Sequence, residues 1–195
     1  AAADLGRFFQ GRLTASFRLQ ALVFRDVLTG VYNRSYFADQ VEKEIQLARR
    51  KGETLGLCII DIDDFKAFNT RFGYAGGDRV LREVAQRLRA SLRASDTLAR
   101  FGGDEFAALL APPFAPHEGP LIAARIRDTI CGLRFELETL DQALRQTVVG
   151  VSVGGAMYPR DGESLNELLR SANRNLFEAK QKGKNGWSFP AQHPA

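Results

Sequence analysis

Two short acidic stretches of the chain have residue types and settings suited to cation binding. The first, "DIDD" at residues 61–64, directly follows the apolar run "LGLCII". The second, "GGDE" at residues 102–105, separates two short apolar runs. Carboxylates that are brought together repel one another, and their pKa values rise unless a cation is bound. Each stretch also has a simpler interpretation, as a solvated strand end or as a hairpin turn with glycine at its tip.

The chemistry that fits both stretches is phosphoryl transfer from a nucleoside triphosphate. Oxygen ligands without nearby His or Cys favour Mg²⁺, which usually shares its coordination sphere with water and substrate phosphates. Gly102 and Gly103 would let a phosphate approach the backbone amides with no Cβ in the way. Metal-assisted transfer of a phosphoryl group uses all of these parts.

The surrounding elements are expected to bring the two stretches together. "TLGLCIIDID" at residues 54–63 is almost continuously apolar, which is typical of a central strand covered on both faces. Two short strands are predicted around residues 102–105, and if they neighbour the first strand, the acids meet at one end of the sheet. Further patterns predict helices at about residues 35–50, 80–92 and 121–131, a strand at 147–156, a helix opened by the capping box "SLNE" at 164–167, and an edge strand at "NGWSF". The sequence therefore predicts an α/β (α+β mixed) fold, with a central mixed sheet wrapped by helices.

Composition limits the class of protein and its partners. The chain has 195 residues, a formal net charge of +4 and 45% hydrophobic residues, as expected for a soluble globular domain. Its basic residues are dispersed, so nucleic acid is not an expected partner. Cys58 and Cys131 cannot build a disulfide framework, and no apolar run approaches the roughly 20 residues of a membrane span. We expect a cytoplasmic domain, the C-terminal part of a longer parent chain, and the sequence leaves open whether that parent is anchored in a membrane.

Several motifs together carry a resemblance to a known family. "GGDEF" at residues 102–106 is joined by "DVLTGVYNR", "DIDDFKAFN", "GD" at 77–78, "YPRDG" and "AKQKGKNG" in one order and spacing. Over residues 26–189 the chain resembles the GGDEF family, the diguanylate cyclases, which condense two GTP into cyclic di-GMP. The resemblance implies a fold like the palm of nucleotidyl cyclases and polymerases, with the motif on a β-hairpin.

The resemblance also implies roles for individual residues. Asp104 would be the base for the attacking 3′-hydroxyl, with Glu105 beside it, and Lys66 would stabilise the charge that develops on the transferred group. Two Mg²⁺ (or Mn²⁺) ions per active site would be held by Asp61, the backbone carbonyl of Ile62, Asp104 and Glu105. GTP would be bound by Gly102 and Gly103 near the phosphates, Lys180 and Lys184 on the outer phosphates, and Asn69 and Asp78 on guanine.

The guanine and phosphate assignments compete with structural interpretations. A carboxylate at Asp78 can accept from guanine N1–H and the amino group together, which favours GTP over ATP. Asp78 would otherwise be the N-cap of a helix beginning at Val80. Lys180 and Lys184, one helical turn apart, would otherwise be a solvated helix end favoured by the helix dipole.

A product-binding site is also implied. The family often has Arg-x-x-Asp shortly before the hairpin, and "RASD" supplies Arg93 and Asp96 at that offset. Arg pairs well with a guanine edge or a phosphate, whereas the structural alternative is a helix-end Arg and a turn Asp. A second arginine would come from Arg125 or Arg127.

The chain departs from the family pattern at four places, none of them a proposed metal ligand or base. It has Thr70 after Asn69, Tyr74 after Gly73, Asn173 in place of a common Asp and Phe177 in place of a frequent Tyr. These departures leave the rate of any activity open.

The predicted function is diguanylate cyclase activity in a two-fold homodimer, with product inhibition through Arg93 and Asp96. The predicted organisation is a lead-in helix at residues 1–25, the catalytic domain at 26–189 and a tail at 190–195, with a sensor or regulatory domain upstream in the parent chain. Two alternatives remain: a non-catalytic cyclic di-GMP receptor, and a cyclase with relaxed base choice.

Overall fold

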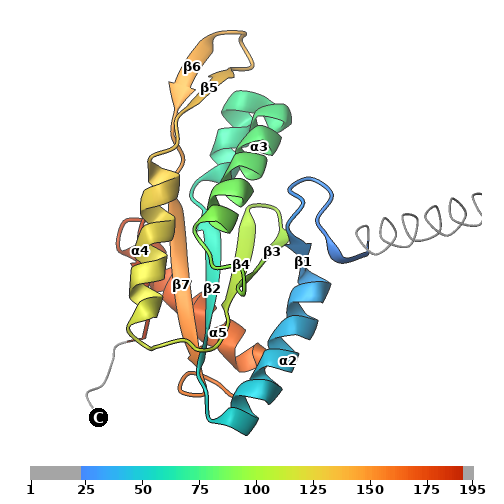
Figure 1. Ribbon diagram of the computed structural model, residues 1–195. Coiled ribbons are helices and arrows are strands. Elements are labelled where there is room, and N and C mark those ends of the chain that lie inside the picture. The colour runs from blue at the N-terminus through green and yellow to red at the C-terminus, as the bar shows by residue number, and fades with distance from the viewer. Residues whose placement is uncertain (1–22, 191–195) are drawn as a thin grey trace, which may run out of the picture.

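A six-stranded mixed sheet forms the centre of the molecule in the computed structural model, which describes residues 23–190 (Figure 1). The strand order is β1-β3-β4-β2-β7-β8, and β5 and β6 form a separate two-stranded arm. Most of the predicted lead-in helix and most of the tail lie outside the described residues. In chain order the elements are β1 (Tyr32–Asn33), α2 (Arg34–Lys51), β2 (Leu55–Ile62), α3 (Phe65–Ala90), β3 (Thr97–Gly102), β4 (Glu105–Leu110), α4 (Glu118–Cys131), β5 (Phe135–Glu138), β6 (Leu144–Thr147), β7 (Val151–Tyr158), α5 (Leu165–Gln181) and β8 (Trp187–Ser188).

Strand β2 lies inside the sheet and pairs antiparallel with both β4 and β7. All of its residues are buried except Asp61, which is half-buried near its end. This confirms the prediction of a central strand, because only a strand covered on both faces is apolar at nearly every position. The C-terminal end of β2 therefore lies between the N-terminal ends of β4 and β7.

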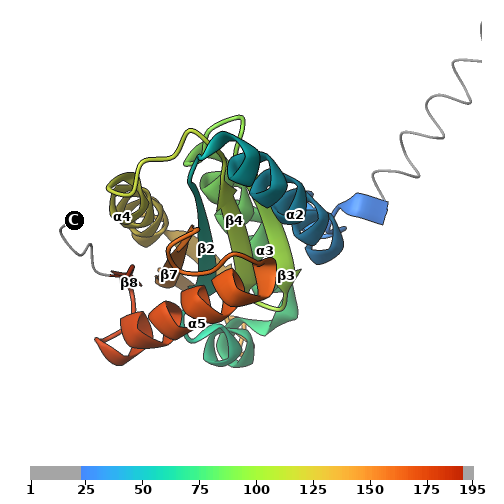
Figure 2. The same cartoon turned by 90° about the horizontal axis from the view of Figure 1, so that it is seen from below.

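The helices form a layer on each face of the sheet (Figure 2). Helices α2 and α5 pack on one face, where they bury Leu55, Leu57 and Ile59 of β2. Helices α3 and α4 pack on the other face against Cys58 and Ile60 of the same strand. Side chains of a strand alternate between faces, so this division follows from the sequence of β2. It confirms the predicted α/β architecture.

Helix ends explain how two of these helices are placed. Helix α2 ends at Gly52, which adopts a left-handed conformation with φ 67°. Helix α5 begins at the predicted capping box, in which Ser164 accepts from the Glu167 backbone N–H and the Glu167 side chain accepts from the Ser164 N–H. The cap thus fixes the start of the helix that carries Lys180.

Helix α3 begins 15 residues before the helix predicted from Val80 and includes a kink. The kink lies at Gly73, which has φ 72° and ψ 169°. Gly76 and Gly77 beyond it are helical, although glycine lowers helix propensity by roughly 1 kcal/mol relative to alanine. The early start was missed because these glycines suggest a break where the chain is helical.

The β5–β6 arm was also missed, and it extends beyond the sheet beside α3 (Figure 1). Only Phe135 and Leu137 of its eight strand residues are buried, so its hydrophobic pattern is short. The backbone N–H of Leu140, at the tip, donates to the Arg71 carbonyl of α3 at 3.2 Å. The arm therefore leans on the first half of α3.

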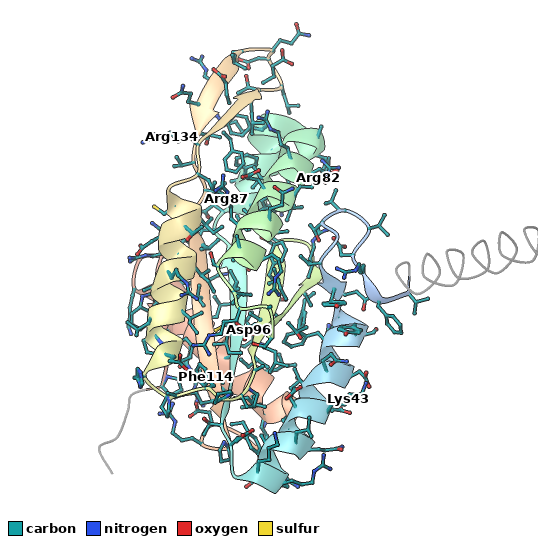
Figure 3. All side chains as sticks on the ribbon, viewed as in Figure 1. Lys43, Arg82, Arg87, Asp96, Phe114 and Arg134 are labelled. Carbon is teal, nitrogen blue, oxygen red and sulfur yellow. The ribbon has the colours of Figure 1, made fainter. Side chains whose placement is uncertain are left out.

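The proline-rich loop after β4 closes one end of the core through Phe114 (Figure 3). Phe114 is buried, and a Cβ added at Gly56 of β2 would lie 2.8 Å from its ring. The Phe114 ring therefore packs directly against the backbone of β2, in space that a side chain at Gly56 would fill. None of the helices in residues 23–190 is long and apolar enough to cross a membrane.

Candidate active site

The two acidic stretches meet at one end of the sheet. Asp61 of β2 is paired in register with Glu105 of β4 on one side and with Ser152 of β7 on the other. The Ile62 N–H donates to the Asp104 carbonyl at 3.2 Å, which ties the hairpin tip to the end of β2. The structure thus brings together the acids that the sequence places 43 and 44 residues apart.

The hairpin tip requires its two glycines and is held by an arginine. Gly102 and Gly103 have φ of 141° and 53°, which other residues rarely adopt. The Arg100 guanidinium donates to the Gly103 carbonyl at 2.6 and 3.0 Å and pairs with Asp26 at 3.2 Å. The support from Asp26 and Arg100 was not predicted, since neither residue lies in the acidic stretches.

Burial and mutual repulsion shape the electrostatics of the acids. Burial raises the pKa of Asp61, against the lowering effect of the Lys180 ammonium and with a further raising effect from Asp104. Burial also raises the pKa of Glu105, and the charge of Asp61 raises it further. Lys180 Nζ lies 2.7 Å from Asp61 Oδ1, whereas the positive charge that lowers the pKa of Glu105 most is that of Arg34. These carboxylates gain from any cation that binds among them.

The oxygen donors at this strand end suit a hard divalent cation. Within residues 23–190, no group of three or more His, Cys, Asp or Glu side chains is already arranged around a point that would hold a metal ion. Asp61 is paired with Lys180, so the donor set fits a metal only once that ammonium moves away. Asp61 and Glu105 are paired in register, and the negative charge of Asp104 raises the pKa of both. This donor set therefore fits the divalent cation expected from the sequence.

A cleft of about 660 Å³ lies next to the acids, between the hairpin tip and the first half of α3. Four predicted site residues line it: Lys66, Asn69, Gly103 and Asp104. Asn69 Oδ1 is buried and has no hydrogen-bond partner, which is costly for a polar atom unless a ligand supplies the donor. The cleft therefore offers an unpaired acceptor to a ligand.

Asp78 lies inside α3, so it is not the cap of a helix beginning at Val80. It follows Gly77, where an added Cβ would lie 2.0 Å from Asn69 Oδ1. Asp78 thus sits one residue from the close contact with Asn69, although it does not line the cleft itself. The structural alternative weighed for Asp78 is wrong, because the helix continues past it in both directions.

The two predicted phosphate lysines come from different kinds of structure. Lys180 lies on α5, whereas Lys184 lies in the loop after it with φ 60°. The prediction that they are one helical turn apart is wrong, because α5 ends at Gln181 and Gly183 turns the chain. Lys184 Nζ donates to Asp64 Oδ1 at 2.6 Å.

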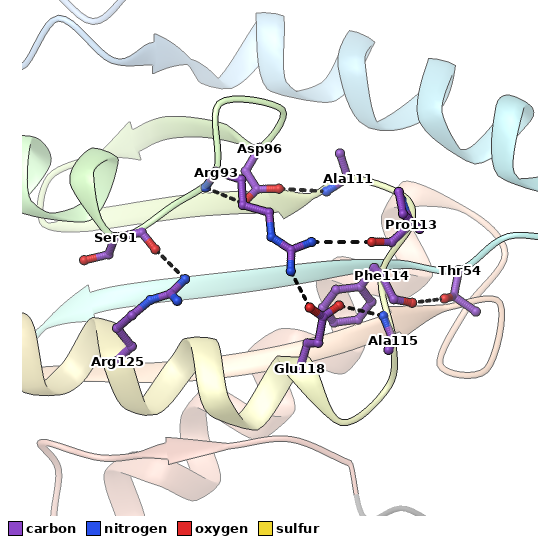
Figure 4. A network of polar contacts seen from close by, with 10 residues as sticks. All are labelled: Thr54, Ser91, Arg93, Asp96, Ala111, Pro113, Phe114, Ala115, Glu118 and Arg125. Atoms are coloured by element: carbon purple, nitrogen blue, oxygen red, sulfur yellow. Dashed lines mark hydrogen bonds and ion pairs between the residues drawn. The ribbon is translucent and has the colours of Figure 1, made fainter.

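Arg93 and Asp96 have distinct surroundings at the start of β3 (Figure 4). Asp96 is buried, and its carboxylate accepts from the backbone N–H groups of Arg93 at 2.9 Å and Ala111 at 3.1 Å. Arg93 is half-exposed and pairs with Glu118 in the first turn of α4. Asp96 therefore holds the turn, and Arg93 presents a half-exposed positive charge beside α4.

Of the two candidate second arginines, Arg125 is the one that faces this turn. It donates to the Ser91 carbonyl at 2.7 Å (Figure 4). Arg127 instead pairs with its neighbour Asp128. Arg125 and Arg93 thus lie on the same side of α4.

Comparison with known proteins agrees with this geometry. The family model described as "Diguanylate cyclase, GGDEF domain" matches residues 23–186. The bifunctional diguanylate cyclase/cyclic di-GMP phosphodiesterase MucR of Pseudomonas aeruginosa is 35% identical over 175 residues, which are 90% of this chain and 24% of MucR. The chain therefore spans about a quarter of that relative.

Solved structures share the fold. The GGDEF domain of TpbB from Pseudomonas aeruginosa has a TM-score of 0.78 at 33% identity, covering 86% of this chain and 94% of that one. The coiled coil and GGDEF domain of DgcB from Caulobacter crescentus, in complex with c-di-GMP, has a TM-score of 0.83 at 25% identity and covers 97% of each chain. With its hairpin, strand-end acids and sheet order all in place, this chain belongs to the GGDEF family of diguanylate cyclase domains.

Proposed function

We propose that the protein is a diguanylate cyclase that converts two GTP into cyclic di-GMP and two pyrophosphates. The observation that carries the proposal is the pairing of Asp61 with Glu105 beside a cleft lined by Lys66, Asn69 and Asp104. Carboxylates for a metal, a lysine and an unpaired amide acceptor therefore lie together at one end of the sheet. Family membership supports the same activity.

In the proposed reaction, the 3′-oxygen of one GTP attacks the α-phosphate of the other. Asp104 takes the proton of that hydroxyl. The bond between the α-phosphorus and the oxygen that bridges it to the β-phosphate breaks, and pyrophosphate leaves with that oxygen. The same step at the second α-phosphate closes the ring. Lys66 stabilises the charge on the transferred group, and Lys180 and Lys184 hold the outer phosphates.

The metal site is proposed to comprise Asp61, the Ile62 carbonyl, Asp104 and Glu105. Mg²⁺ or Mn²⁺, two ions per active site, would supply charge neutralisation and activation of the attacking hydroxyl. Gly102 and Gly103 have no Cβ, so the hairpin backbone can lie against the phosphates.

Guanine is proposed to be read by Asn69 and Asp78. Asn69 Oδ1 has no partner in the protein and is free to accept from the base. The cleft of about 660 Å³ is of a size that suits one nucleotide, since ligand pockets run to roughly 300–1,000 Å³.

Joining two nucleotides needs two such domains. We therefore expect an active homodimer in which two clefts face each other across a two-fold axis. Residues 1–25, for which the sequence predicts a lead-in helix, would control that pairing together with an upstream sensor or regulatory domain in a longer cytoplasmic or membrane-anchored parent chain. The short share of MucR that this chain spans supports a longer parent.

Product inhibition is proposed through Arg93 and Asp96, with Arg125 as the second arginine. Both arginines lie between α4 and the turn before β3, where Arg93 pairs with Glu118 and Arg125 donates to the Ser91 carbonyl, which supports the proposal. The occurrence of c-di-GMP in the DgcB complex is a further support.

The test is to incubate the chain with GTP and Mg²⁺ and to identify the nucleotide product. Cyclic di-GMP is expected from the native chain and none from Asp104→Ala, while Asp39→Ala, which breaks only the exposed Asp39–Lys43 pair, should match the native rate. Binding of cyclic di-GMP without turnover would instead identify a receptor, and a mixed GMP–AMP product would identify relaxed base choice. Normal turnover by Asp104→Ala would refute the site.

A further inference from the structure

The loop that carries Lys184 has an unusual backbone. Gly183, Lys184 and Asn185 are consecutive residues with φ of 117°, 60° and 44°. Glycine adopts such values freely and asparagine does so more readily than most residues, whereas Lys184 does so only where the surrounding structure holds it. The direction in which Lys184 leaves the chain therefore depends on what fixes this loop.

Asp63 holds the loop by a charged side chain, in addition to the bonds that the Gly183 and Lys184 N–H groups donate to the Lys180 carbonyl at 3.3 Å. Asp63 Oδ2 accepts from the Asn185 backbone N–H at 2.8 Å. Its Oδ1 accepts from Ser152 Oγ of β7 at 2.7 Å, and its own N–H donates to the Gly150 carbonyl at 2.9 Å. The carboxylate is thus held by β7 on one side and holds the loop on the other.

Space for this contact is provided by Gly150. A Cβ added there would lie 3.2 Å from Asp63 Oδ2 and 3.2 Å from Asn185 Cβ, which is closer than ordinary contact. Any larger residue at 150 would press on the bond between Asp63 and Asn185.

The two neighbouring acids of the "DIDD" segment have different tasks. Asp61 faces Glu105 and Lys180 at the strand end. Both oxygens of Asp63 instead accept from donors of the protein itself, at the base of the Lys184 loop. Charge-assisted hydrogen bonds to backbone N–H groups are among the stronger ones, so this is an effective tether.

We infer that Asp63 is a positioning residue for nucleotide binding: it holds the Asn185 N–H and so sets the left-handed loop that aims Lys184 at the outer phosphates. Asp63 does not touch the nucleotide or the metal in this role. The inference rests on the proposed function, because the role of Lys184 on phosphates is itself proposed.

Two substitutions at Asp63 separate the tether from its charge. Asp63→Ala removes both acceptors. Asp63→Asn keeps the shape, because the amide oxygen can accept from the Asn185 N–H while the amide nitrogen donates to the Ser152 hydroxyl. Loss of one strong hydrogen bond lowers a binding affinity by about tenfold. Asp63→Ala should therefore raise the KM for GTP by about that factor and change kcat much less. Asp63→Asn should stay close to the native chain.

The dissociation constants of GTP and GMP supply the second readout. GMP lacks the outer phosphates, so Asp63→Ala should weaken GTP and leave GMP within about twofold. Gly150→Ala should give the same signature with the carboxylate intact, which covers the case in which Asp63→Ala does not fold. Equal impairment of Asp63→Asn and Asp63→Ala, or equal loss of GTP and GMP, would overturn the inference.

Hydrogen exchange of the Asn185 amide in the ligand-free protein tests the tether apart from activity. Exchange should be at least about tenfold faster in Asp63→Ala than in the native chain and near-native in Asp63→Asn. Unchanged exchange in Asp63→Ala would overturn the inference even in an active cyclase. A native chain that bound no GTP, with this exchange pattern intact, would instead overturn the proposed function and the nucleotide role that rests on it, and would leave only the tether from Asp63 to Asn185 established.

Discussion

Lys180 and Asp61 form an ion pair of 2.7 Å across the end of the sheet. The lysine proposed to bind phosphate is thus the counter-ion of the aspartate proposed to bind metal. In the ligand-free protein each neutralises the other, and both must be released when metal and GTP bind. Binding of the metal and of GTP should therefore respond in opposite directions to the loss of this lysine.

Lys180→Met is expected to tighten Mn²⁺ binding in the absence of nucleotide, by about three- to tenfold, because an unpaired Asp61 next to Glu105 attracts a cation more strongly. The same change should weaken GTP binding. Titration of Mn²⁺ followed by electron paramagnetic resonance measures the first effect. Lys43→Met, which breaks the exposed pair with Asp39, is the control and should change neither. Weaker Mn²⁺ binding by Lys180→Met would contradict the expectation.

Glu105→Gln should stabilise the metal-free protein at neutral pH. Burial raises the pKa of Glu105 above its ordinary 4.5, so the folded state holds its negative charge less well than the unfolded state does. The free energy of unfolding therefore falls as pH rises from 4.5 through the raised pKa of the folded state. At pH values below both pKa values this loss of stability is absent. Removing the charge should raise the melting temperature by about 1–3 °C at neutral pH and have no such effect in acid.

Differential scanning calorimetry at two pH values, with a chelator present, makes this measurement. Saturating metal and GTP should reverse the order if Glu105 is a metal ligand as proposed, because the metal then stabilises only the chain with the native carboxylate. An equal gain at acid and neutral pH would show that the charge is not responsible.

Glu118→Gln should strengthen binding of cyclic di-GMP if Arg93 is part of its site. Glu118 pairs with Arg93 while also accepting from the Ala115 N–H at 2.8 Å, so the acid competes with any anionic ligand. Exposed ion pairs contribute roughly 0.2–1 kcal/mol, so a gain of a few-fold is expected. Arg93→Ala should do the reverse and relieve product inhibition without abolishing turnover. Isothermal titration calorimetry with cyclic di-GMP measures the binding, and initial rates at rising concentrations of cyclic di-GMP measure the product inhibition.

Gly77→Ala should lower GTP affinity even though alanine favours helices. An added Cβ would lie 2.0 Å from Asn69 Oδ1, so the amide must move from its place in the cleft. Helix propensity alone predicts a gain of about 1 kcal/mol, which opposes the cost of crowding against Asn69 and Phe65. Gly132→Ala, whose added Cβ meets nothing closer than 3.5 Å, is the matched control. Fluorescence titration with a GTP analogue should show weaker binding for the first variant only.

The sequence predicts the parts of this fold that have a strong hydrophobic pattern or a local signal. β2 is continuously apolar, and its central position follows from that. The capping box at Ser164 and Glu167 is read from four residues, and the hairpin is marked by Gly102 and Gly103. Each of these features depends on near neighbours in the chain.

Features that depend on distant neighbours were missed. The tether from Asp63 to Asn185 joins residues 122 apart, and nothing in "DIDD" separates Asp63 from Asp61. The Arg93–Glu118 pair depends on where α4 starts after a proline-rich loop. Tertiary contact decides both.

Strand β2 is hydrogen-bonded along its length to β4 on one side and to β7 on the other. Removal of a single residue within it would turn Asp61 to the opposite face of the sheet and shift it out of step with both partners at once. The β5–β6 arm has no partner strand in the main sheet, so a change in its length leaves the register of β2 with β4 and β7 unaltered. The molecule therefore combines a central strand whose length is fixed by pairing on both sides with an arm whose length does not set the position of the acids.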